Sequence, residues 1–202
     1  MKKFLGALYR RLANRWASTL ATLLRRCGFK YRFVYFQSYR IGHLAIEPDL
    51  FLKEELLGIR PRLPVVWLAP RDHLANRHLF AYWAKHIRAV QSPWISRLLR
   101  PLALTEALGL ETYTYAIDRH HTARYPQIQL QWQDRPPLLA LTEEDREFGW
   151  NVLKKLGVPD GAWFVCIHCR ESGYYPAEAF HSFRDGDILT YVSAIEAVTT
   201  RG

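Results

Sequence analysis

Short apolar segments alternate with helical segments along this chain, and this alternation constrains its possible folds most strongly. Residues 64–70, an apolar segment with a proline at each end, predict a buried strand, and residues 31–37 and 163–169 predict two more. Helical patterns follow these strands, at residues 47–57, 75–87 and 188–198. Strands that are repeatedly followed by helices predict an α/β fold with a parallel sheet.

Charge is distributed unevenly over the 202 residues. The net charge is +9, but residues 1–46 contain ten Lys and Arg and no acid, whereas the rest of the chain has eighteen basic and nineteen acidic residues. A nucleic-acid-binding protein spreads basic residues over its working face. The near-neutral body therefore argues against a nucleic-acid partner.

Residues 1–30 predict a basic amphipathic helix, because leucines recur at helical spacing among Lys and Arg. Arg10, Arg11 and Arg15 interrupt the apolar run too early for a secretory signal or a spanning helix. Two interpretations stay open: contact with an anionic membrane surface, or a helix packed on the domain with a solvated basic face. Three cysteines without a signal peptide favour the cytoplasm, with peripheral attachment to the inner face of the cell membrane under the first interpretation.

The first predicted strand leads into a loop that carries a glycine and polar side chains. Arg40, Gly42 and His43 lie between residues 31–37 and the helix expected to begin at Glu47. A strand, a glycine-bearing loop and a helix together present backbone N–H groups to a ligand. We therefore predict that Arg40 and Gly42 bind a ligand and that His43 faces it.

A His-x-Arg pair ends the predicted strand at residues 163–169. His168 and Arg170 share one face of that strand, and His181 and Arg184 follow just before a helix. Ligands bind at the carboxyl ends of strands in open α/β sheets, and an Arg fork suits phosphate. The diphosphate of a sugar nucleotide is one candidate ligand. The alternative is an Arg in a surface ion pair and a His bonded to a loop carbonyl.

Two features of this region mimic metal or redox motifs. Asp185 and Asp187 match an Asp-x-Asp metal motif but directly precede a helix, which favours an N-cap acid with a turn glycine. Cys166 and Cys169 would lie on opposite faces of a strand and lack a second pair of ligands. We therefore predict no metal site and no cofactor.

The remaining segments suggest two lobes. Residues 111–116 predict a further strand, residues 117–138 an extended crossing between lobes, and Thr142 the N-cap of another helix. The predicted parts are the basic helix 1–30, a first lobe 31–138, and a linker helix with the beginning of a second lobe, 139–202. No parallel strand follows the helix at 188–198, so we expect the second lobe to be incomplete.

The chain resembles a family of uncharacterised bacterial glycosyltransferases. The resemblance lies in residues 40–45, 47–54, 164–174, 181–187 and 191–194. It implies a GT-B-type enzyme, with a Rossmann-like first lobe and the start of a second Rossmann-like lobe. The His-x-Arg segment is similar to the one with which fucosyltransferases hold the diphosphate of a GDP-sugar, which implies Arg170 on the donor phosphate and His168 beside it.

The expected activity is sugar transfer with inversion from a nucleotide-sugar, with GDP-sugars favoured, to a cell-surface glycan or lipid-linked acceptor. A base deprotonates the acceptor hydroxyl, and cationic groups stabilise the leaving diphosphate. His43 and Glu171 are the candidates for the base. We expect donor binding by Arg40, Gly42, His168, Arg170, His181 and Arg184. The alternative is a non-catalytic membrane-surface or partner-binding protein derived from such a lobe, and the activity of this truncated chain stays open.

Overall fold

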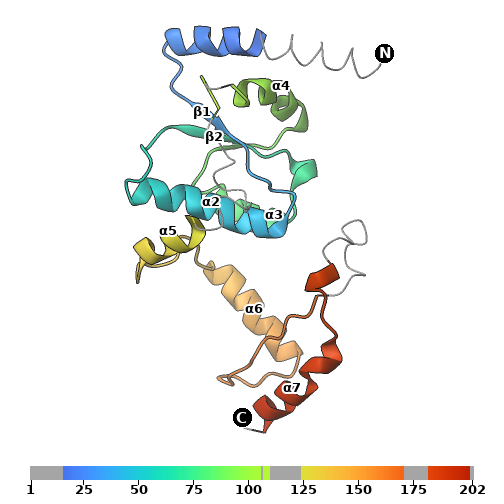
Figure 1. The fold of residues 1–202 in the computed structure, drawn as a ribbon. Coiled ribbons are helices and arrows are strands. Elements are labelled where there is room, and N and C mark those ends of the chain that lie inside the picture. Colours follow the sequence, from blue (N-terminus) through green and yellow to red (C-terminus); the bar gives the residue numbers. More distant parts are fainter. Residues whose placement is uncertain (1–15, 106, 110–123, 171–181, 201–202) are drawn as a thin grey trace, which may run out of the picture. The chain divides into compact units, whose positions relative to one another are not determined.

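The computed structural model describes residues 16–105, 107–109, 124–170 and 182–200 (Figure 1). The chain divides into two compact units, Met1–Ala140 and Leu141–Gly202, and each is described by itself. The first unit holds a small parallel sheet between helices, so the protein is a mixed α/β protein as predicted. The strand predicted at residues 111–116 and residues 1–15 of the basic helix lie outside the described residues.

Three short strands form the sheet. They are β1 (Arg32–Val34), β2 (Val65–Leu68) and β3 (Ala89–Val90), all parallel and in the order β1-β2-β3. Phe33 pairs with Val66, and Trp67 pairs with Ala89. The predicted strands at 31–37 and 64–70 are confirmed in shorter form. β3 was not predicted, because a strand of two residues is too short to show an alternation of apolar and polar residues.

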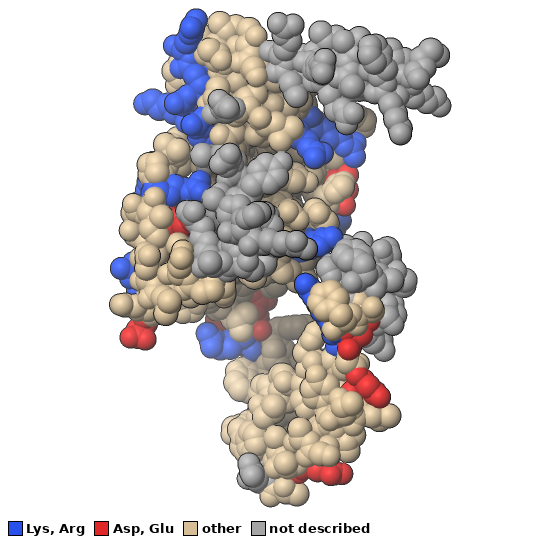
Figure 2. Space-filling view, in the orientation of Figure 1, with Lys and Arg blue, Asp and Glu red and all other residues tan. Residues whose placement is uncertain are grey.

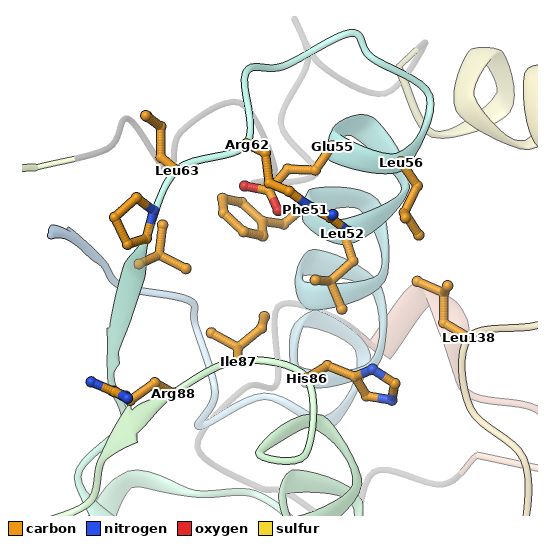
Figure 3. A pocket seen from close by; sticks show the side chains of 12 residues that line it. Phe51, Leu52, Glu55, Leu56, Arg62, Leu63, His86, Ile87, Arg88 and Leu138 are labelled. Atoms are coloured by element: carbon orange, nitrogen blue, oxygen red, sulfur yellow. The ribbon is translucent and has the colours of Figure 1, made fainter. Parts of the chain in front are cut away.

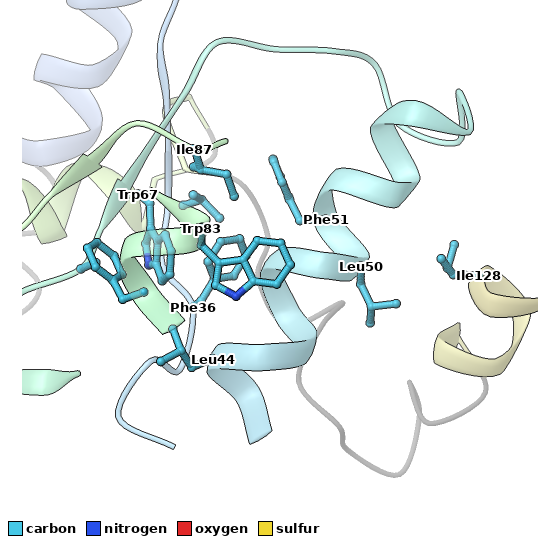
Figure 4. Packing of buried hydrophobic residues seen from close by; sticks show 11 residues of the cluster. Phe36, Leu44, Leu50, Phe51, Trp67, Trp83, Ile87 and Ile128 are labelled. Atoms are coloured by element: carbon cyan, nitrogen blue, oxygen red, sulfur yellow. The ribbon is translucent and has the colours of Figure 1, made fainter. Parts of the chain in front are cut away.

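One face of the sheet is covered by α2 (Ile41–Leu56) and α3 (Arg77–Trp83), and α5 (Arg124–Trp132) packs against α2 through Ile128. Trp67 of β2 is fully buried beneath them, with its ring 5.0 Å from that of Phe36 and 4.9 Å from that of Phe80 (Figure 4). The buried members of this cluster are Val34, Phe36, Leu44, Leu50, Phe51, Trp67, Ala69, Phe80, Trp83, Ile87 and Ile128.

The opposite face carries a helix at residues 16–26 and α4 (Pro93–Ala103). Neighbouring strand residues point to opposite faces, so Phe33 and Leu68 pack here whereas Val34 and Trp67 pack on the other side. The buried members of this second cluster are Ala17, Ala21, Phe33, Leu68, Leu102 and Leu108. Within the described residues, no helix combines the length and the apolar character needed to cross a bilayer.

Two predictions for the first unit are wrong. α2 begins at Ile41 and contains Pro48, whereas the sequence analysis began this helix at Glu47. A proline inside a helix removes one backbone hydrogen bond, and burial of residues such as Leu44 and Phe51 offsets that loss. The extended crossing expected at residues 117–138 contains α5, which is anchored by the buried side chain of Ile128.

The second unit contains α6 (Glu143–Lys155), the short 3-10 helix η4 (Ile188–Tyr191) and α7 (Val192–Thr199). Thr142 caps α6 as predicted, because its Oγ1 accepts a hydrogen bond of 3.2 Å from the backbone N–H of Asp145. The strand predicted at residues 163–169 is wrong: this segment is irregular, and Trp163 and Phe164 are 59% and 49% exposed. A strand needs a neighbour to bond, and the described residues of this unit contain none.

Candidate active site

The candidate site lies where β1 ends and α2 begins. Arg40 is the N-cap residue of α2, and its backbone N–H donates to the carbonyl of Gln37 at 3.1 Å. Gly42 follows in the first turn, and a Cβ added there would meet no atom within 4 Å. Arg40, Gly42 and His43 therefore lie together at the carboxyl edge of the sheet. They lie in a helix start, whereas the sequence analysis placed them in a loop.

His43 and Glu47 form a hydrogen-bonded pair one turn apart on α2. Nδ1 of His43 lies 2.6 Å from Oε1 of Glu47. The other carboxylate oxygen, Oε2, accepts the backbone N–H of Gln37 at 2.7 Å. Glu47 is buried, with 2% of its side chain exposed, whereas the His43 side chain is 16% exposed. Both oxygens of this buried carboxylate thus have a donor, as burial of a charge requires.

This pair determines which nitrogen of His43 is available for chemistry. An ionised carboxylate only accepts hydrogen bonds, so with an ionised Glu47 the bond places a proton on Nδ1 of His43 and turns Nε2 away from the carboxylate. A carboxylate that holds imidazole in this tautomer is the arrangement found in acid–base catalytic sites. Glu47 therefore orients the ring of His43, a relationship that the sequence pattern did not reveal because Glu47 was expected to start the helix.

The loops that follow β1 and β2 are hydrogen-bonded to each other. The backbone N–H of Ala75 donates to the carbonyl of Ser38 at 2.8 Å, and the Ser38 hydroxyl donates to the carbonyl of His73 at 3.4 Å. The loop after β2 is bonded in turn to the chain after β3, because the N–H of Arg71 donates to the carbonyl of Gln91 at 3.0 Å. The edge is thus one connected structure.

These loops add basic residues that the sequence analysis did not single out. Arg71 and His73 lie in the short 3-10 helix η1 (Arg71–His73), and both are exposed. Arg97 of α4 forms an exposed ion pair with Asp72 at 3.3 Å. The signal that could have found Arg71 and His73 is their place directly after β2, the same rule that selected Arg40 after β1. With Arg40, they give this edge a basic character suited to an anionic ligand.

The predicted residues of the second unit centre on an ion pair. Nε of Arg170 lies 3.4 Å from Oδ1 of Asp185, and both side chains are largely buried. The backbone supports this pair, since the N–H of Gly186 donates to the carbonyl of Arg170 at 2.9 Å. The thiol of Cys169 also donates to the carbonyl of Gly186 at 3.1 Å. Arg170 is therefore held against a carboxylate, the arrangement that the sequence analysis gave as the alternative to phosphate binding.

His168, Arg184 and Asp187 are other predicted or singled-out residues of this unit that the structure describes. His168 and Arg184 are exposed, and the Arg184 guanidinium lies 5.3 Å from the ring centroid of its neighbour Phe183. Asp187 is the N-cap of η4, and its side chain accepts the N–H of Leu189 at 2.9 Å, which confirms the predicted cap. Glu171 and His181 lie outside the described residues. No cluster of His, Cys, Asp and Glu that could hold a metal ion occurs within the ranges that the structure describes.

A cavity of about 370 Å³ lies at the opposite, amino edge of the sheet, between α2 and the starts of β2 and β3 (Figure 3). Its walls combine apolar side chains such as Phe51 and Ile87 with the polar side chains of Glu55, Arg62 and His86. Burial raises the pKa of Glu55 in this wall, against the opposing effects of the Leu63 N–H and the Arg60 and Arg62 guanidinium groups. The cavity contains none of the predicted site residues.

Fold and site define a mixed α/β protein with a basic carboxyl edge and a carboxylate-oriented histidine. No protein-family model matches the chain, and no curated protein or solved structure matches it either. The resemblance to glycosyltransferases therefore stays a prediction.

Proposed function

We propose that this chain belongs to an inverting glycosyltransferase that uses His43 as its general base. The hydrogen bond between His43 and the buried Glu47 is the observation that carries this proposal. It orients the imidazole of His43 at the carboxyl edge of a parallel sheet, where α/β proteins bind ligands, which supports a role as base. The family resemblance supplies the reaction class.

The proposed reaction is a single displacement. Nε2 of His43 takes the proton of an acceptor hydroxyl as the oxygen forms a bond to the anomeric carbon of the donor sugar. The bond from that carbon to the diphosphate oxygen breaks, and its electron pair leaves with the nucleoside diphosphate. Inversion at the anomeric carbon follows, because the acceptor attacks the face opposite the leaving group.

Positive charge is available for the departing diphosphate. Arg40 and Arg71 lie at the edge that carries His43, and the N-terminus of α2 has no side-chain cap. Helix N-termini and Arg side chains both bind phosphate oxygens. For the second unit taken by itself, the family resemblance implies Arg170 as a phosphate ligand, and it would exchange Asp185 for phosphate on binding. GDP-sugars are the favoured donors, with a glycan or lipid-linked acceptor.

A second candidate function is partner binding without catalysis. It is favoured by the apolar residues of the second unit that remain exposed, among them Trp163, Phe164 and Val165. Burial of such side chains against another protein favours association, and the cost of lost translational and rotational freedom offsets part of this gain. This function predicts a stable protein complex and no affinity for nucleotide-sugars.

Calorimetric titration of the whole chain with GDP-sugars and UDP-sugars distinguishes the two functions. The transferase proposal predicts saturable binding of at least one nucleotide-sugar and weaker binding of the free sugar. A folded chain that binds none of these donors would contradict it and leave the partner-binding function. Circular dichroism of the same sample establishes that the chain is folded.

A further inference from the structure

The outer layer on one face of the sheet exposes large apolar side chains. This layer consists of helix 16–26 and α4, which share one buried cluster against β1 and β2. On α4, Trp94 is 78% exposed, Leu98 68% and Ile95 50%. The exposed apolar residues of helix 16–26 are Trp16, Leu20 and Leu23. Side chains of this size are costly to leave in water, so they indicate a contact surface.

The two helices are fixed to the sheet by other residues. Ala17 and Ala21 are fully buried under helix 16–26, and Leu102 is buried under α4. The hydroxyl of Ser96 also bonds α4 to the carbonyl of Val90 at 3.1 Å. The exposed side chains are therefore not needed to hold the helices in place, and they lie on a preformed surface.

The same layer is basic. Helix 16–26 carries Arg25 and Arg26, and α4 carries Arg100 and Arg97, all exposed, with Arg97 in an ion pair with Asp72. Neither residues 16–30 nor residues 93–104 contain an Asp or Glu. Basic side chains gather around helix 16–26 in Figure 2. Since each basic residue near an anionic bilayer contributes attraction, this composition complements a negatively charged surface.

We propose that helix 16–26 and α4 together bind an anionic membrane surface. Helices that lie in a bilayer interface insert Trp and Leu among the lipid headgroups and keep Arg and Lys beside the phosphates, which is the combination on this layer. A second copy of the chain would bring two basic faces together, and a nucleic acid offers no apolar phase for Ile95 and Leu98. Both are less suited to this surface than lipid.

The proposal extends the membrane contact expected for residues 1–30 to a second helix, and it does not depend on the transferase chemistry. α4 begins directly after β3, at the carboxyl edge of the sheet. The ion pair of Arg97 with Asp72 joins α4 to the loop after β2. A membrane bound by α4 therefore lies near the edge that holds His43, which favours a lipid-linked acceptor if the transferase proposal also holds.

Vesicle sedimentation of the whole chain tests the proposal, and it requires no nucleotide-sugar. Wild type is compared on phosphatidylcholine vesicles with and without phosphatidylglycerol, at low and high salt. We expect binding that needs the anionic lipid and weakens with salt. Leu98→Ser should reduce partitioning about tenfold. The matched control is Leu130→Ser on α5, because Leu130 is 74% exposed and lies on the helix layer of the other face.

Several outcomes of vesicle sedimentation would overturn the proposal. They are no sedimentation with anionic vesicles, equal binding to both kinds of vesicle, and equal loss of binding in Leu98→Ser and Leu130→Ser. A double variant with Leu98→Ser and Trp94→Ser that binds anionic vesicles as well as wild type would also overturn the proposal. That result would assign the membrane contact to the N-terminal residues alone. Self-association that Leu98→Ser abolishes, without vesicle binding, would assign the surface to a second copy of the chain.

Discussion

Oε1 of Glu47 lies 2.6 Å from Nδ1 of His43, four residues earlier on α2. Residues four apart lie on one side of a helix, so α2 itself sets the spacing of the pair. The N–H of Gln37, just after β1, bonds the other carboxylate oxygen at 2.7 Å and so ties the pair to the sheet. The histidine is thus held in orientation by both elements that meet at this edge.

Glu47 is predicted to act by positioning His43. Glu47→Gln keeps an oxygen for the Gln37 N–H, but an amide N–H facing Nδ1 favours the other imidazole tautomer, as for the analogous change in catalytic triads. We expect kcat to fall by about 100-fold or more with little change in donor affinity. Steady-state kinetics and calorimetry measure the two effects. A loss of donor affinity with kcat unchanged would assign Glu47 to donor binding.

Glu47→Ala should also destabilise the fold, because it leaves the N–H of Gln37 without its acceptor. An unsatisfied buried donor costs about 1–3 kcal/mol in the free energy of unfolding. Urea unfolding of Glu47→Ala and Glu47→Gln measures the difference. Equal stability of the two variants would show that the Gln37 hydrogen bond contributes little.

Trp67 is expected to be the side chain on which the first unit depends most. It is fully buried between Phe36 and Phe80, and its replacement by Ala leaves a large cavity. Trp67→Ala should lower the free energy of unfolding by about 3–5 kcal/mol. Trp94→Ala is the matched control, since Trp94 is 78% exposed, and should change it by less than about 0.5 kcal/mol. Similar losses in both variants would contradict the packing of this core.

Glu55 should make stability depend on pH. Burial raises its pKa above the ordinary value of 4.5, so the folded chain holds its proton to higher pH than the unfolded chain. The free energy of unfolding should therefore fall as pH rises from about 4.5 through the raised pKa. Glu55→Gln should remove this fall and stabilise the chain near neutral pH, whereas Glu143→Gln, at an exposed carboxylate, should not. Urea unfolding at about pH 4 and about pH 7.5 tests this prediction. An equal change in the free energy of unfolding between the two pH values in wild type and in Glu55→Gln would refute it.

The ion pair of Arg170 with Asp185 gives opposite predictions for its two members. If Arg170 holds the donor diphosphate, Arg170→Ala should abolish binding of a GDP-sugar. Asp185→Asn should strengthen it severalfold at low salt, because the carboxylate no longer competes with phosphate. Calorimetry on both variants measures this, with Arg184→Ala as a nearby exposed Arg for comparison. Weaker binding by Asp185→Asn would mean that the pair is a structural support of the site.

The sequence predicted elements that have strong local signals. The prolines around β2 and the Thr142 cap of α6 are of this kind, and both elements form where expected. Local signals misled where tertiary contacts decide the outcome. Pro48 suggested a helix start, yet α2 continues through it because its neighbours are buried. The apolar segment 163–169 has strand composition, but no described strand lies beside it to complete a ladder.

Half of the candidate site could be found from the sequence. His43 and Arg40 were found because they follow a predicted strand. Glu47 was missed as the partner of His43, because a helix that starts at Glu47 cannot place the two residues one turn apart. Arg71 and His73 were missed because their loop has no glycine pattern, and the loop contacts through Ser38 arise only in three dimensions.

Release of nucleoside diphosphate by the whole chain shows whether His43 is the base of a glycosyl transfer. GDP-sugars and UDP-sugars are supplied with glycan or lipid-linked acceptors, and wild type is compared with His43→Gln. We expect release by wild type and a rate at least about 100-fold lower in the variant, with donor affinity unchanged. Release at the wild-type rate by His43→Gln, or no release by a folded wild-type chain that binds the donor, would contradict it.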